Sequence, residues 1–132
     1  FIWRLHPVID IKKVFSMLKI KNEDLPRNIT ISNNNLEKDS RKALFVIYRG
    51  SAAVLTAVLN RCLPLFYEVN FNNCDPLIKI FNKKNYFKSK KDLFRLMKNN
   101  PYSEKNLKSK IKMLENDFFS PINKSNILKT LS

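Results

Sequence analysis

Two short stretches of the sequence carry residue types suited to binding a phosphate group. Residues 4–7 read RLHP and hold the one histidine of the chain, and residues 49–51 read RGS and hold its one glycine. A guanidinium group can donate two parallel hydrogen bonds to a phosphate, and an imidazole adds a further donor. Glycine permits a tight turn with positive φ and lets a bound group approach the backbone. The candidate phosphate ligands are Arg4, His6, Arg49, Gly50 and Ser51.

The elements that must position these residues follow a regular alternation. Four short apolar runs predict β-strands over residues 1–5, 28–32, 44–48 and 63–67. The segments between them, residues 9–20, 35–42 and 51–61, have helical spacing or composition. The last of these is apolar on nearly all sides, which predicts a buried helix. Strands and helices in alternation are typical of a Rossmann-like parallel sheet, so we expect an α/β fold with about four strands.

Each predicted strand is followed by a polar residue. His6 follows the first, Ser32 the second, Arg49 to Ser51 the third and Glu68 the fourth. Ligands of open parallel sheets bind at the carboxyl ends of the strands, so these residues are expected at one edge. A purely structural alternative stays open for each: a hydrogen-bonded histidine, a plain glycine turn, a serine N-cap and a solvated glutamate.

The second half of the chain reads as helical. Helices are predicted over residues 76–82 and 122–131, and two more begin at Ser89 and Ser103, both suitable N-caps. A chain of 132 residues is the size of one domain, which we divide into an α/β core over residues 1–75 and a basic helical extension over residues 76–132.

The chain carries 25 basic and 11 acidic residues, a formal charge of +14, and the excess is concentrated after residue 75. Three interpretations are open: a compositional bias, contact of Lys105, Lys108 and Lys112 with an anionic membrane, and binding of nucleic acid. The last is disfavoured because aromatic and basic residues do not interleave.

Two cysteines without metal-ligand spacing predict reduced thiols and a cytoplasmic protein, at most at the inner face of the membrane. The carboxylates do not cluster, so no metal is expected.

Several motifs, taken in order, resemble one enzyme family. RLHP at 4–7, LPRNITIS at 25–32, YRGSAAVLTAVLNRCLPLFYE at 48–68 and DPL at 75–77 resemble the C-terminal half of bacterial surface-polysaccharide glycosyltransferases of the GT-B fold. The resemblance covers residues 1 to about 80 and extends only loosely into the helical part. Each motif is short, so the specificity comes from their order and spacing.

The resemblance implies that this half binds a nucleotide-sugar donor and that a missing N-terminal domain binds the acceptor. The start at Phe1, inside an apolar run, agrees with a longer protein. His6 and Pro7 match the family's HP motif and Ser51 its serine turn, both of which contact donor phosphate; Arg4 and Arg49 are suited to the same task. Glu68 and Ser32 stand where the donor ribose or sugar would lie. The resemblance implies no cofactor besides the donor. His6 is the one catalytic candidate. This half alone should catalyse little or no sugar transfer.

The sequence also departs from the family pattern. Many relatives have two serines where this chain has Gly50 and Ser51, and a glycine where Arg61, Cys62 and Leu63 precede Pro64. The alternatives to a glycosyltransferase are a nucleotide-sugar epimerase or a glycerophosphate-type polymer transferase on the same fold, and a basic module that binds nucleic acid.

Overall fold

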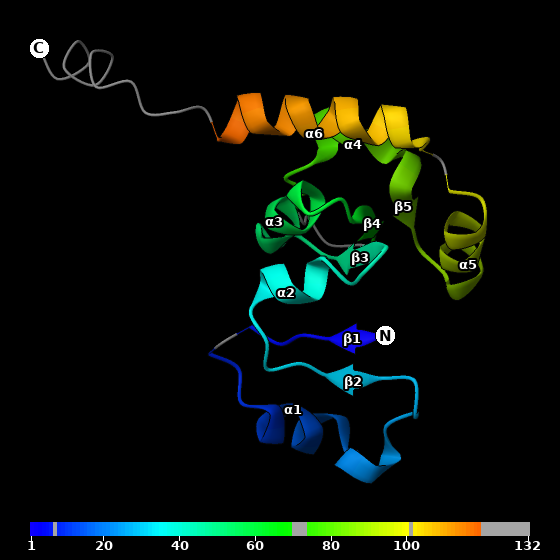
Figure 1. Ribbon diagram of the computed structural model, residues 1–132. Helices are drawn as coiled ribbons and strands as arrows, with labels where there is room; N and C mark the ends of the chain where they lie inside the picture. Colours follow the sequence, from blue (N-terminus) through cyan, green and yellow to red (C-terminus); the bar gives the residue numbers. More distant parts are fainter. Residues whose placement is uncertain (7, 70–73, 101, 120–132) are drawn as a thin grey trace, which may run out of the picture.

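The computed structural model describes residues 1–6, 8–69, 74–100 and 102–119 (Figure 1). The elements in chain order are β1 (Ile2–Trp3), α1 (Ile11–Leu18), the 3₁₀ helix η1 (Asn22–Asp24), β2 (Thr30–Ile31), α2 (Leu36–Ser40), β3 (Phe45–Tyr48), α3 (Ala53–Leu59), β4 (Leu63–Tyr67), α4 (Ile78–Phe81), the 3₁₀ helix η2 (Asn82–Asn85), β5 (Tyr86–Phe87), α5 (Lys90–Lys98) and α6 (Glu104–Phe118). The predicted helix over residues 122–131 lies outside the described residues.

The strands form two small parallel sheets. β1 pairs with β2, and β4 lies between β3 and β5 in the second sheet. The mixed α/β class with parallel strands is therefore confirmed. The sheet itself differs from the expectation, since the described residues contain five strands in two sheets instead of about four in one. β5 escaped prediction because two residues are too few to show a period.

The buried side chain of Asn85 links the central strand β4 to the start of β5. Pro64 stands opposite Val46 of β3 and has no N–H group to donate. Its carbonyl oxygen accepts a hydrogen bond of 2.9 Å from Nδ2 of Asn85, which is buried. The Asn85 amide thus takes the place of a ladder bond that the short strand β5 does not provide, and it fixes the residue before Tyr86.

The core lies on both faces of the three-stranded sheet. On one face, α3, α4 and α6 pack together with Tyr48 and Phe66; the buried side chains contributed by these helices include Val54, Val58, Ile80, Phe81, Leu107 and Leu114. On the other face, Leu96 of α5 packs against Leu65 and Phe87. The prediction that helix α3 is buried on all sides is wrong for its first turn, where Ala53 is exposed.

The helices of the C-terminal part begin where their serines predict. Ser89 accepts a hydrogen bond from the Asp92 N–H at 3.1 Å, and Ser103 accepts one from the Asn106 N–H at 3.3 Å. Helix α6 is held to α4 by Lys110, whose ammonium group donates to the Ile80 carbonyl and lies 5.1 Å from the ring centre of Phe81. This part of the chain is therefore built into the core through β5, α4 and α6.

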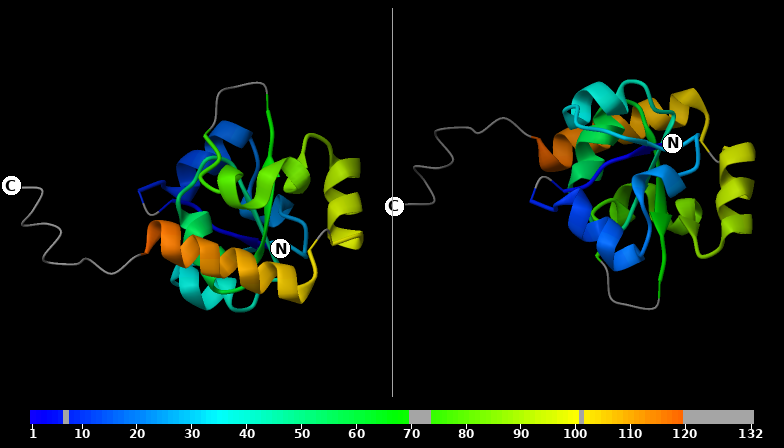
Figure 2. Two further views of the ribbon diagram at one scale, coloured as in Figure 1. Left: turned by 90° about the horizontal axis from the view of Figure 1, so that it is seen from above. Right: turned by 90° about the horizontal axis from the view of Figure 1, so that it is seen from below.

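The N-terminal elements are attached through fewer buried groups. Helix α1 has no buried residue, and its Phe15 ring lies 6.3 Å from that of Trp3. Helix α5 lies at the opposite flank, where both views of Figure 2 show it at the edge of the molecule. Within the described ranges, no helix is long and apolar enough to cross a membrane.

Candidate functional site

The turn between β3 and α3 has the backbone that the lone glycine predicts. Gly50 adopts a φ of 69°, in the left-handed region, and the turn residues Arg49, Gly50 and Ser51 are exposed. The Ser51 hydroxyl accepts a hydrogen bond from the Ala53 N–H at 3.3 Å. Within the described part of the chain, the N–H groups of Gly50, Ser51 and Ala52 form no backbone hydrogen bond. The turn thus presents successive N–H donors directly after the exposed Arg49 in the chain, a combination suited to an anion.

His6 is held by contacts within its own turn. Its carbonyl oxygen accepts from the Ile9 N–H at 2.8 Å, and its Nδ1 lies 3.4 Å from the Val8 N–H. His6 follows β1 of the two-stranded sheet, whereas the Gly50 turn follows β3 of the three-stranded sheet, so the two do not lie at the edge of one sheet as expected. Pro7 lies outside the described residues.

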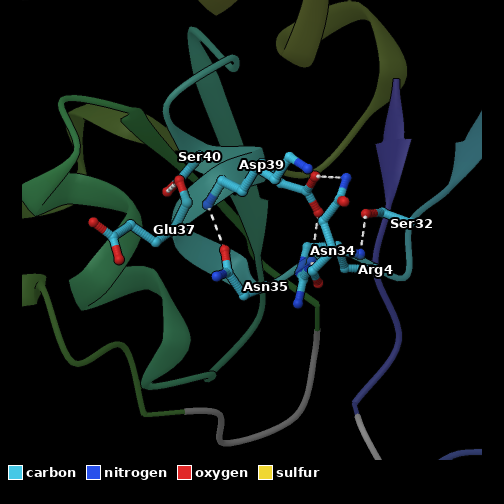
Figure 3. A network of polar contacts seen from close by, with 8 residues as sticks. Arg4, Ser32, Asn34, Asn35, Glu37, Asp39 and Ser40 are labelled. Atoms are coloured by element: carbon cyan, nitrogen blue, oxygen red, sulfur yellow. Dashed lines mark hydrogen bonds and ion pairs between the residues drawn. The ribbon is translucent and has the colours of Figure 1, made fainter.

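Arg4 and Ser32 converge, but on a carboxylate that the sequence did not single out (Figure 3). The Arg4 guanidinium donates to Asp39 of α2 and to the Asn34 carbonyl, at 2.6 Å to the latter. The Asn34 amide donates to the other Asp39 oxygen at 3.0 Å, and the Ser32 hydroxyl accepts from the Asn34 N–H at 3.1 Å. This network ties the end of β1, the loop after β2 and α2 together.

The network has a clear electrostatic effect on Asp39, which is only 4% exposed. The hydrogen bond with the Ser32 hydroxyl, followed by the Arg4 guanidinium and the Asn34 amide, lowers the pKa of Asp39 to about 2, against the opposite effect of burial. Arg4 is thus committed to an internal ion pair, and its role as a phosphate ligand stays a prediction. Nothing in the sequence marks Asp39, because its partner lies 35 residues away.

Glu68 lies where the end of β4 meets β5. Its N–H donates to the Phe87 carbonyl at 2.9 Å, and its carboxylate pairs with Lys88 at 3.4 Å. The side chain is partly exposed, so it can still reach a hydroxyl group of a bound ligand. Its predicted contact with ribose or sugar remains a prediction.

A second buried carboxylate, Asp75, anchors the chain where it returns to the core before α4. It accepts hydrogen bonds from the Tyr48 hydroxyl at 2.7 Å, the Tyr86 hydroxyl at 2.8 Å and the Leu77 N–H at 2.9 Å. Burial, and then the bond to Asp75, raises the pKa of both tyrosines above its usual value. The rings of Tyr48 and Tyr86 flank that of Phe66, at 5.4 and 4.5 Å between centres. The cluster joins β3, β4 and β5 beneath the carboxyl edge of the sheet.

Comparisons of the chain with family models, characterised proteins and solved structures gave no match.

The remaining features of the described residues are a surface depression, a buried thiol and the acidic side chains, and none of them forms a second candidate site. A surface depression of about 290 Å³ is lined by the side chains around α2, including Asn35, Lys38 and Arg41, and by none of the predicted ligands. Cys62 is buried, donates to the Ser40 carbonyl at 3.1 Å, and has its pKa raised to about 11 by burial. Among the described residues, no three histidine, cysteine or acidic side chains are grouped so that they could hold a metal ion.

Proposed function

We propose that this chain is the donor-binding half of a glycosyltransferase of the GT-B fold, and that it holds a nucleotide-sugar through its phosphate groups. The observation that carries the proposal is the turn at Gly50, with its positive φ, the exposed Arg49, and N–H groups that form no backbone hydrogen bond with any described residue. The parallel α/β arrangement supports it, because the turn follows the carboxyl end of a strand, where such folds bind nucleotides.

The chemistry of sugar transfer gives these groups their roles. When the bond between the sugar carbon and the phosphate oxygen breaks, negative charge develops on the departing phosphate. Donors placed beforehand around that oxygen stabilise the transition state by about 3 kcal/mol each. In this proposal the N–H groups of Gly50 and Ser51 and the Arg49 guanidinium bind the phosphate, and the Nε2–H of His6 donates to the leaving oxygen. The base that deprotonates the acceptor belongs to the other half of the enzyme.

The remaining predicted ligands receive supporting roles. Arg4 and Ser32 act through Asp39, because their polar groups hold the loop after β2 against the end of β1. They are therefore positioning residues in this proposal. Glu68, at the end of β4, is the candidate partner for a hydroxyl group of the donor.

The proposal is tested by donor binding, since this half alone is not expected to transfer sugar. Isothermal titration with sugar nucleotides of uracil, guanine and cytosine should reveal binding of at least one of them. Arg49→Gln should weaken that binding roughly 10- to 100-fold, the loss expected for charge-assisted hydrogen bonds. The matched control is Arg27→Gln, because Arg27 is also exposed but precedes β2, at the other end of the strands.

The control should change affinity less than twofold. Ser51→Ala provides a second variant that leaves the charge intact, with an expected loss of about fivefold. The proposal fails if no sugar nucleotide binds to the folded chain. It also fails if the two arginine variants weaken binding equally, because the effect would then be one of net charge.

A further inference from the structure

Helix α5 has one face in the core and one face turned outward. Leu96 is buried, and Leu93 and Met97 pack with it against the sheet. The opposite face is formed by Lys90, Lys91, Phe94, Arg95 and Lys98, all of them exposed. Because the helix lies at the edge of the molecule in both views of Figure 2, this outward face is not covered by another described element.

The outward face of α5 carries a dense positive charge. It presents four cations over a helix of nine residues. The one acidic residue of the helix, Asp92, is bound by the Ser89 hydroxyl at 2.8 Å and by Arg95 at 3.1 Å. Lys91 and Lys98 form no ion pair with any described residue. The charge of this face is therefore left mostly uncompensated by the protein itself.

An aromatic ring stands in the middle of these cations. Phe94 is 54% exposed, and the Lys90 ammonium group lies 5.9 Å from its ring centre. Lys90, Lys91 and Lys98 stand four residues before, three before and four after it, so all three are its neighbours on the helix surface. A partner that matches this face must offer negative charge at its surface and an apolar layer within reach of one ring.

A leaflet of anionic phospholipid meets both requirements. Its headgroups attract lysines near the surface, and the ring can enter the boundary between headgroups and acyl chains. A single-stranded nucleic acid would be expected to stack on several successive rings, whereas α5 contains one. A second copy of the chain would present the same charges and repel.

We propose that the outward face of α5 binds an anionic phospholipid membrane, with Phe94 entering the interface and Lys90, Lys91 and Lys98 contacting headgroups. One of the three interpretations of the charge was a membrane contact through the lysines of α6; this proposal assigns the contact to α5 instead. The inference does not depend on the proposed transferase function.

Co-sedimentation of the full chain with vesicles tests this surface. Phosphatidylcholine vesicles with phosphatidylglycerol should bind the protein, and pure phosphatidylcholine vesicles should not. The variant K91Q/K98Q should bind the anionic vesicles about 25-fold more weakly, from about fivefold for each lysine. The matched control K105Q/K112Q removes the same charge at the same spacing from α6 and should lose less than threefold.

A second pair of variants tests the ring. Phe94→Ser should weaken binding about fivefold, because the variant loses the free energy gained when the exposed half of the ring is buried in the membrane interface. Phe119→Ser is the control, because Phe119 is similarly exposed, at 49%, but lies at the end of α6. All substituted side chains are exposed, and circular dichroism verifies that the variants are folded.

Four results would overturn the proposal. The first is that the chain does not bind anionic vesicles. The second is that the two lysine variants lose equal affinity, and the third is that Phe94→Ser binds as tightly as the unchanged chain. The fourth is tighter binding to a single-stranded oligonucleotide than to vesicles at the same ionic strength, abolished by K91Q/K98Q, which would assign the face to nucleic acid.

Discussion

Replacing Asp39 by asparagine tests the network that joins the end of β1 to α2. The pKa of Asp39 falls from 3.8 to about 2 in the folded protein, which corresponds to about 2 kcal/mol of stability at neutral pH. Because the folded pKa lies below the unfolded one, this contribution is complete well above pH 3.8 and is lost as the pH falls toward 2. Asp39→Asn should therefore lower the free energy of unfolding by about 2 kcal/mol at pH 7 and by far less at pH 2.

Urea denaturation from pH 2 to pH 7 measures both quantities. The matched control is Glu37→Gln on the same helix, whose exposed pair with Arg41 should contribute less than about 0.5 kcal/mol. If Asp39→Asn loses stability equally at every pH, the carboxylate is not stabilised by its charge. The account of this network would then be wrong.

Three further substitutions or reactions probe other parts of the structure. Tyr48→Phe should destabilise the fold by about 1–2 kcal/mol, because it removes a buried hydrogen bond to Asp75, whereas Tyr67→Phe at an exposed position should change little; equal effects in urea denaturation would contradict this. Gly50→Val should cost about 1–2 kcal/mol, because its φ of 69° is unfavourable for a β-branched residue, and Gly50→Asn should cost less; the reverse order would argue against the observed turn. A thiol reagent at pH 8 should modify the exposed Cys74 quickly and Cys62 only after unfolding, since burial raises the pKa of Cys62 to about 11; rapid modification of both thiols would contradict this.

The sequence predicts the strands and helices best where the pattern is long or the capping residue is clear. The apolar runs before Arg49 and Glu68 become β3 and β4, and the serines at 89 and 103 cap α5 and α6. These features depend on local chemistry, so neighbouring residues are enough to show them.

The contacts between distant residues could not be predicted in the same way. Arg4 is suited to a phosphate, yet the fold places Asp39 beside it, and no local pattern relates the two. Asp75 directly precedes the predicted helix over residues 76–82, and nothing in the sequence shows that it receives two tyrosine hydroxyls from β3 and β5. Such partners are set by how the elements pack. By contrast, glycine permits a positive φ, so the backbone of the Gly50 turn could be expected from the residue type and its place after a strand.

The central claim, that the Gly50 turn holds the phosphate of a nucleotide-sugar, is tested most directly by amide chemical shifts. Addition of the sugar nucleotide that binds best should move the N–H signals of Gly50, Ser51 and Ala52 the most, with smaller shifts near His6. If these signals stay in place while the largest shifts fall on α5 or α2, the turn is not the phosphate site.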